Sequence, residues 1–244
     1  ENKPNRKVTI KQIDHFKIST TDLSVIKYKI KLNSQSSDIQ SLKKLAWDIF
    51  LQHNNNLKEE DADFRDGQIE IIRNCLEGND TLGLLPTGSG KSICYQLACI
   101  LKPGISFVVA PIRALMLDQT LDLKSAFFDR VEFMSGEHNP QQKNEILANF
   151  ASGKYFFIFI SPERFQNLKF RQSFILVVNE FNIAYAVVDE VHCLSEWGHD
   201  FRLSYLSLAK TIRDQSHPKH KIIFIGLTAT ASTKVIKDIQ VEFD

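Results

Sequence analysis

The chain has 244 residues, of which 43% are hydrophobic and 24% are charged. This composition excludes collagen, coiled-coil and disordered chains as the main interpretation. Its 30 basic and 29 acidic side chains nearly cancel, so overall charge identifies no partner, and nucleic-acid binding would need a local patch. The longest apolar runs, residues 155–160 and 173–178, are far shorter than the roughly 18–20 residues of a membrane span, so no membrane partner is expected.

Residues 1–60 are predicted to form an extension made of a β-hairpin, a linker and a helix. Residues 26–32 alternate strictly between apolar and lysine side chains, which is the period of a β-strand, and an earlier stretch with a polar turn provides its partner. After a polar linker, apolar residues recur at helical spacing from Ile39 to Phe50. We interpret the lysine-rich face as a solvated strand face, with nucleic-acid contact as the alternative.

Residues 61–244 show six short apolar runs separated by helical stretches. Each run has four to six residues, is rich in valine, isoleucine and phenylalanine, and lacks strict alternation, which is typical of strands buried on both faces. Helices that cover both faces of such strands form an α/β domain with a doubly wound parallel sheet. The predicted strands are Thr81–Leu85, Ile105–Ala110, Val131–Met134, Tyr155–Ile160, Ile183–Val188 and Ile222–Leu227.

The four cysteines are predicted to be reduced residues of the core. They form no CxxC pair and have no histidine at the spacing of a zinc ligand. Such residues pack as small hydrophobic side chains, and unpaired cysteines are typical of a reducing compartment. The residues are Cys75, Cys94, Cys99 and Cys193.

The segment LLPTGSGKS at residues 84–92 joins the first predicted strand to a helical stretch. Glycines allow the backbone to curl until several N–H groups converge on a phosphate, and the N-terminus of the next helix attracts the same anion. Lys91 is predicted to reach the β- and γ-phosphates, and Ser92 to ligate Mg²⁺. A chance turn is the alternative. The predicted site for a nucleoside triphosphate comprises Thr87, Gly88, Ser89, Gly90, Lys91 and Ser92.

Asp189 and Glu190 end a strongly apolar run, where side chains emerge at the carboxyl edge of a parallel sheet. Asp189 is predicted to hold Mg²⁺ through water. Glu190 is predicted to orient and deprotonate the attacking water. The alternative is that the two acids only begin a helix, whose N-terminus favours negative charge.

The sequence resembles the RecQ family of superfamily 2 ATP-dependent DNA helicases. DEVH at 189–192 and the following CLSEWGHDFR at 193–202 are similar to the second motif and the aromatic-rich loop of that family. Four more motifs resemble the family's in the same order: FRDGQ (64–68), APIRAL (110–115), SPER (161–164) and TAT (228–230). The resemblance covers about residues 64–235 and implies the first of two RecA-like lobes.

The resemblance implies that Arg65 and Gln68 bind adenine, because an amide side chain can both donate to and accept from the base. The alternative is that this segment only begins an amphipathic helix. Asp61 stands where the family usually has an aromatic residue that stacks on adenine. That stacking partner is therefore missing from this position.

The resemblance also implies nucleic-acid contacts. Pro111 and Arg113 lie in the first DNA-contacting motif. Trp197, Phe201 and Arg202 lie in the aromatic-rich loop, where rings and a guanidinium suit stacking and charge contacts to single strands. Packing of the rings beneath the loop is the alternative.

A third implied group couples the nucleotide to the nucleic acid. His192, Thr228 and Thr230 follow the last two predicted strands of the sheet or end them. Imidazole and hydroxyl groups can change hydrogen-bond partners when the γ-phosphate leaves. A purely structural histidine is the alternative.

Together these residues imply a RecA-like α/β domain that follows a hairpin-plus-helix extension. It would be the ATP-binding motor lobe of a RecQ-like 3′–5′ DNA helicase that uses ATP and Mg²⁺. The resemblance implies two partners, single-stranded or tailed duplex DNA and a second RecA-like lobe. A chain that starts at Glu1 rather than Met also suggests an excised fragment. The alternatives are an RNA helicase lobe of the same superfamily or an ATP-gated nucleic-acid-binding module. The expected location is the cytoplasm of a bacterium or the nucleus of a eukaryote.

Overall fold

The computed structural model describes residues 36–51, 58, 63–102, 104–125, 128–196, 199–215 and 221–243, with the backbone alone for 36–38, 51, 195–196, 199–202, 213 and 215. The predicted hairpin and Asp61 lie outside the described residues. The helices are α1 (Ser36–Ala46), α2 (Gln68–Glu77), α3 (Lys91–Leu101), α4 (Arg113–Ser125), α5 (Pro140–Ala151), α6 (Leu168–Glu180), α7 (Cys193–Glu196), α8 (His199–Gln215) and α9 (Thr233–Phe243). A π-helical turn (Trp47–Leu51) follows α1, and a 3-10 helix (Pro162–Gln166) precedes α6.

Six parallel strands form one sheet in the order β1-β6-β5-β2-β4-β3. They are β1 (Thr81–Leu84), β2 (Ile105–Val109), β3 (Val131–Met134), β4 (Phe157–Ile160), β5 (Ile183–Asp189) and β6 (Ile223–Thr228). All six predicted strands are present, and β2, β4 and β6 are buried at every position. The predicted α/β class with a parallel sheet is therefore confirmed.

The strand ends differ from the prediction by one or two residues. β4 begins at Phe157 and not at Tyr155, because the preceding loop is drawn toward Arg130, whose carbonyl accepts from the Phe156 backbone N–H at 2.7 Å. β5 reaches Asp189, which pairs in register with Leu227 of β6. The extension of β5 brings its last residue, Asp189, to the edge of the sheet where the predicted site residues stand.

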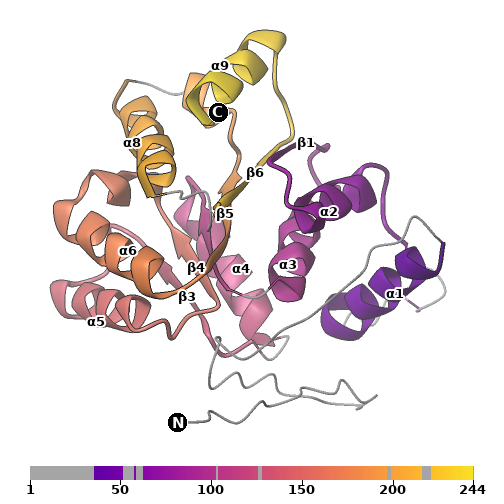
Figure 1. The fold of residues 1–244 in the computed structure, drawn as a ribbon, viewed down its shortest axis with the longest axis horizontal. Helices are drawn as coiled ribbons and strands as arrows, with labels where there is room; N and C mark the ends of the chain where they lie inside the picture. The colour runs from indigo at the N-terminus through magenta and orange to yellow at the C-terminus, as the bar shows by residue number, and fades with distance from the viewer. Residues whose placement is uncertain are drawn as a thin grey trace.

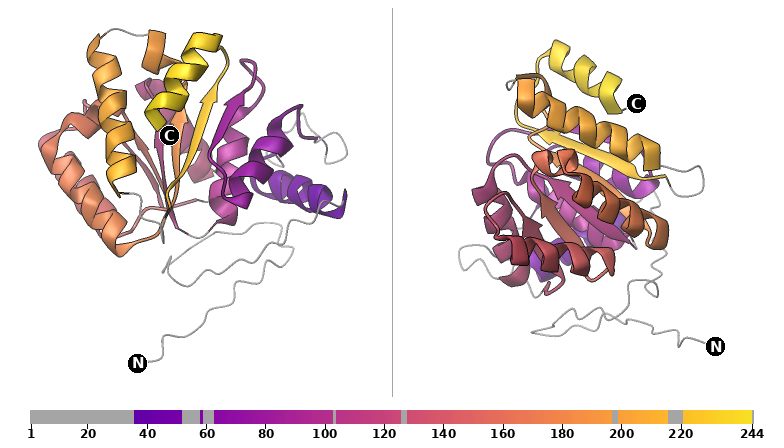
Figure 2. Two further views of the ribbon diagram at one scale, coloured as in Figure 1. Left: turned by 45° about the horizontal axis from the view of Figure 1, so that its top comes forward. Right: turned by 90° about the vertical axis from the view of Figure 1, so that its left-hand side faces the viewer.

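Helices cover both faces of the sheet, as Figures 1 and 2 show. α1 to α4 pack on one face and share a core that includes Leu97, Met116 and Leu227. The remaining long helices, α5, α6, α8 and α9, pack on the other face around a group of phenylalanines. In that group Phe107 of β2 meets Phe174 of α6 edge to face, with ring centroids 5.1 Å apart. Because apolar layers cover both faces of the sheet, the strand sequences are continuous apolar runs instead of alternating ones.

The predicted helix of the extension is present as α1 and the π-helical turn. Leu42, Ala46 and Ile49 are at most 4% exposed, and they belong to the same core as Ile71 of α2. The domain boundary at residue 60 stays a prediction, and this helix shares its core with the rest of the chain.

Two further predictions concern cysteines and membranes. All four cysteines are buried and free, as the sequence predicts. Among the described residues, no helix has the length and apolarity needed to cross a membrane.

Candidate nucleotide site

A tight loop connects β1 to α3 at the carboxyl edge of the sheet. Gly88 and Gly90 have φ angles of 75° and 76°, a left-handed conformation that glycine adopts without steric cost. The Leu85 backbone N–H donates to the Thr228 carbonyl at 3.0 Å, which ties the start of the loop to β6. α3 then begins at Lys91, so its first N–H groups, which have no partner within the helix, face the loop.

The loop has the features that a bound phosphate needs. The Ser89 hydroxyl is buried and has no hydrogen-bond partner. A Cβ atom added to Gly88 would meet nothing within 4 Å, so the space beside this residue is open. A buried hydroxyl, free helical N–H groups and the Lys91 ammonium are together suited to a polyphosphate.

Gln68 braces this loop from the start of α2. Its Nε2 donates to the carbonyls of Ser89 at 2.7 Å and of Gly90 at 3.1 Å, and its Oε1 accepts from the Arg65 backbone N–H at 2.8 Å. The Arg65 guanidinium also donates to the Gly88 carbonyl. Gln68 does begin a helix, as the alternative for this segment held, and its carboxamide is engaged by the loop backbone. Adenine binding by Arg65 and Gln68 stays a prediction.

The carboxylates stand where β5 ends, next to the loop. Because β6 lies between β1 and β5, Thr228 at the end of β6 lies between the loop and the Asp189–Glu190 pair. Glu190 Oε1 accepts from Lys91 Nζ at 2.7 Å, and both side chains are largely buried. The strand order therefore brings the predicted phosphate-binding lysine to the predicted base.

Glu190 has an unusual backbone. Its φ angle is 50°, and among the described residues it is the one residue other than glycine with a positive φ. This conformation costs a residue with a Cβ atom about 1–2 kcal/mol, and such strain is found where the fold holds a functional side chain in place. The sharp turn directs the Glu190 side chain toward Lys91 and His192.

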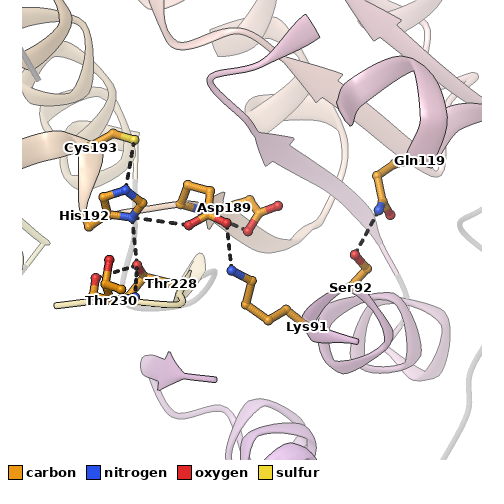
Figure 3. A network of polar contacts seen from close by, with 9 residues as sticks. Lys91, Ser92, Gln119, Asp189, His192, Cys193, Thr228 and Thr230 are labelled. Carbon is orange, nitrogen blue, oxygen red and sulfur yellow. Dashed lines mark hydrogen bonds and ion pairs between the residues drawn. The ribbon is translucent and has the colours of Figure 1, made fainter. Parts of the chain in front are cut away.

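His192 connects Glu190 to β6. Its Nδ1 lies 3.2 Å from Glu190 Oε2 and 2.8 Å from Thr228 Oγ1. The Thr228 hydroxyl donates to the Thr230 carbonyl at 2.8 Å, so its oxygen must accept from the imidazole. Nδ1 therefore carries a proton, and in the neutral ring Nε2 is the acceptor, with Cys193 Sγ 3.8 Å away. The structure thus joins the three predicted coupling residues into one hydrogen-bonded network (Figure 3).

The residues also fit Mg²⁺, which takes oxygen ligands from one or two side chains, phosphates and water. Burial and the Asp189 carboxylate raise the pKa of the Tyr95 hydroxyl, whereas a hydrogen bond with Ser92 lowers it, so both candidate oxygen ligands lie near this group. Burial and the neighbouring Glu190 carboxylate raise the pKa of Asp189 to about 6, against the opposing effect of Lys91. An ionised carboxylate held in a buried position is stabilised by a cation. Among the described residues no group of three or more His, Cys, Asp or Glu could hold a metal by itself, so phosphate and water would complete the shell.

Of the predicted nucleic-acid residues, Pro111 and Arg113 lie elsewhere on the same edge of the sheet. Pro111 and Arg113 follow β2, and the exposed Arg113 pairs with Glu137 after β3, with its Nε 3.1 Å from the carboxylate. Trp197 lies outside the described residues. Phe201 and Arg202 lie in α8, and their side chains lie outside the described part of the chain. Their DNA-binding roles stay predictions.

Two residues at the site were not predicted from the sequence. Gln119 of α4 donates to Ser92 Oγ at 2.9 Å, and Cys193 lies beside the His192 ring. Gln119 lies within a helix with no motif glycine or acid pair around it. Its proximity to APIRAL at residues 110–115 was the one available signal.

The parallel sheet, the phosphate loop and the acidic strand end define a RecA-like domain that binds a nucleoside triphosphate. Residues 65–239 match the DEAD/DEAH box helicase family, and the chain belongs to it.

Related proteins carry RecQ-type names, which confirms the resemblance seen in the sequence. The chain is 38% identical to ATP-dependent DNA helicase Q-like 5 of Arabidopsis thaliana, a match that covers 72% of this chain and 19% of that protein. It is 36% identical to ATP-dependent DNA helicase RecQ of Bacillus subtilis, over 72% and 29% of the two chains. The match to ATP-dependent helicase wrn-1 of Caenorhabditis elegans is 40% over 72% and 16%. The chain thus spans less than a third of each of these relatives.

Solved helicase structures share the fold. The DNA-bound DUF1998 helicase MrfA superposes with a TM-score of 0.64 at 16% identity, over 85% of this chain and 29% of that one. The Hef helicase domain of Pyrococcus furiosus gives 0.56 at 22% identity, over 74% and 36%. At these identities the similarity shows the fold alone.

Proposed function

We propose that this chain is the ATP-binding motor lobe of a RecQ-like DNA helicase. The observation that carries the proposal is the network from Lys91 through Glu190 and His192 to Thr228. It joins the phosphate loop, the candidate base and β6 in one set of contacts, which a domain that only binds nucleotide does not need. The names of the relatives support DNA as the nucleic acid.

ATP would engage this network in a definite order. Its phosphates would attract Lys91 away from Glu190, because both compete for the same ammonium. Glu190 Oε1 would then be free to accept a proton from the attacking water. Mg²⁺, held by Ser92 and Asp189, would supply charge stabilisation at the phosphates.

His192 would couple the loss of the Lys91–Glu190 ion pair to β6. Its Nδ1 proton is shared between Glu190 Oε2 and Thr228 Oγ1 in the structure. A change in the charge around Glu190 alters which of these two contacts is stronger. A change in the His192–Thr228 hydrogen bond would then affect Thr230, whose carbonyl accepts from Thr228, and the segment that leads into α9.

The proposed substrate is single-stranded DNA, along which the motor would move 3′ to 5′ with the help of a second RecA-like lobe. The exposed Arg113 at the start of α4 offers a phosphate contact. Two alternatives differ from this proposal. An RNA helicase lobe would act on RNA instead of DNA, and an ATP-gated binding module would hold nucleic acid without unwinding it.

The test uses the full-length protein. Its ATP hydrolysis is measured with single-stranded DNA and with RNA of the same length, and its unwinding with 3′-tailed and 5′-tailed duplexes. The proposal predicts stimulation by DNA and unwinding of the 3′-tailed duplex. Stimulation by RNA alone would favour the RNA helicase, and DNA binding with no unwinding would favour the binding module.

A further inference from the structure

The side chain of Gln119 forms a polar contact between α4 and the start of α3. Its Nε2 donates to Ser92 Oγ at 2.9 Å, the hydroxyl predicted to ligate Mg²⁺. Figure 3 shows this contact apart from the cluster around His192. Gln119 belongs to no motif that the sequence analysis assigned to the nucleotide.

Two donors hold the other end of the same carboxamide. Gln119 Oε1 accepts from the Tyr95 hydroxyl at 3.1 Å and from Gln96 Nε2 at 2.9 Å. Both donors lie on α3 and are buried, with Tyr95 only 1% exposed and Gln96 6%. With the oxygen held by two donors, the amide N–H groups must point toward Ser92.

This orientation has a consequence for the Ser92 hydroxyl. A hydroxyl oxygen has two lone pairs and one proton. The N–H of Gln119 occupies one lone pair, so one lone pair is left for a cation and the proton is left for an acceptor. The hydroxyl therefore has fewer rotamers open to it than a free serine, and its remaining lone pair is held in one direction.

We propose that Gln119 is a positioning residue that orients the Ser92 hydroxyl for Mg²⁺, so that α4 contributes to the metal-binding half of the nucleotide site. The proposal rests on the proposed function, because it requires a nucleotide bound with its metal. Gln119 itself touches neither the nucleotide nor the reacting atoms. Its effect is on how much Mg²⁺ strengthens nucleotide binding.

The test compares Gln119→Met with the wild-type chain. Methionine has a similar length and cannot replace the three hydrogen bonds of the Gln119 carboxamide. The affinity for a non-hydrolysable ATP analogue is measured with Mg²⁺ and with EDTA. We expect the Mg²⁺-dependent gain to fall about threefold to tenfold, the range of one net hydrogen bond, while the affinity in EDTA stays within about twofold. Gln172→Met, at an exposed glutamine of α6, is the matched control and should change neither value.

A double-mutant cycle separates positioning from general support of α3. In a Ser92→Ala background Gln119→Met should cost no further Mg²⁺-dependent affinity, because the hydroxyl it orients is absent. An undiminished Mg²⁺ gain in Gln119→Met, or an equal loss in the Ser92→Ala background, would overturn the proposal. If Gln119→Met does not fold, Tyr95→Phe removes one donor to Oε1 and must show the same selective loss at smaller size.

The failure of this inference differs from the failure of the proposed function. If the wild-type chain binds no nucleotide, or if the Lys91→Ala variant binds nucleotide with the same affinity as the wild type, both the proposed function and the role of Gln119 are overturned. Normal nucleotide binding that Lys91→Ala weakens, together with an intact Mg²⁺ gain in Gln119→Met, would overturn the role of Gln119 alone.

Discussion

Lys91 and Glu190 are 99 positions apart in the chain, and their side chains form an ion pair of 2.7 Å. Lys91 is 13% exposed and Glu190 22%, so the contact is shielded from water and stronger than a surface pair. The ammonium that should bind phosphates thus neutralises the carboxylate that should accept a proton. Nucleotide binding and release of the base are linked through this one contact.

Lys91→Ala is expected to weaken nucleotide binding by about tenfold to a hundredfold, because charge-assisted hydrogen bonds contribute about 1.5–3 kcal/mol. The affinity for a non-hydrolysable ATP analogue measures this loss. Lys234→Ala, at an exposed lysine of α9, is the control. Wild-type hydrolysis by a full-length Lys91→Ala protein would contradict the assignment of the phosphate loop.

Glu190→Gln is expected to keep nucleotide binding and to lose turnover. The amide cannot accept the proton of the attacking water, and a general base typically contributes about 10²–10⁴-fold. It also ends the ion pair with Lys91, so nucleotide affinity should be equal or higher. Steady-state hydrolysis and analogue binding are measured on the same full-length variant. Loss of both together would show that Glu190 supports the structure and not the chemistry.

Asp189→Asn is expected to stabilise the chain in the absence of nucleotide and metal. Burial raises the pKa of Asp189 to about 6, so the ionised carboxylate is less favourable in the folded than in the unfolded chain. Asparagine removes the charge and keeps an oxygen for the Glu190 backbone N–H, which lies 3.0 Å from the carboxylate. One pKa unit corresponds to about 1.4 kcal/mol, and we expect a gain of about 1–3 kcal/mol in the free energy of unfolding.

The same variant has a defined pH dependence. The raised pKa means that the penalty is complete above about pH 6, falls as the pH drops below 6, and disappears only below about pH 4, where Asp189 becomes protonated in both states. Urea unfolding of the metal-free wild type and variant, at neutral and at mildly acidic pH, measures the difference. An equal gain in the free energy of unfolding at both pH values would show that the gain does not come from removing the charge of Asp189.

Trp197→Ala is expected to leave basal hydrolysis near normal in the full-length protein and to reduce its stimulation by single-stranded DNA. A base stacked on an aromatic ring contributes about 1–3 kcal/mol, so DNA affinity should fall about tenfold or more. Hydrolysis with and without DNA, and DNA binding by the variant, are the measurements. Unchanged stimulation by a folded variant would indicate that Trp197 only packs.

The 244-residue chain by itself is expected to bind Mg-ATP weakly and not to unwind DNA. An arginine supplied from a second lobe typically accelerates phosphoryl transfer by about 10³–10⁵-fold, so the lobe by itself should hydrolyse ATP slowly. The test measures Mg-ATP binding by the isolated chain and its unwinding of a tailed duplex. Robust unwinding would mean that a second copy donates an arginine.

Local signals in the sequence predicted the six strands and most residues of the candidate site. Apolar runs identified all six strands because strands buried on both faces need apolar side chains at every position. Glycines before Lys91 identified the phosphate loop, since few other residues allow that curvature. Asp189 and Glu190 were recognised because strand and acid are adjacent in the chain. Each of these signals is local.

Which of these residues come into contact depends on how the elements pack together. The sequence does not state that β6 lies between β1 and β5, since parallel strands joined by helices can be arranged in several orders. That order places Thr228 beside His192 and Lys91 beside Glu190. The contact of Gln119 with Ser92 depends on how α4 packs against α3, and the left-handed backbone of Glu190 depends on what surrounds it. Such contacts join residues far apart in the chain, and no local propensity encodes them.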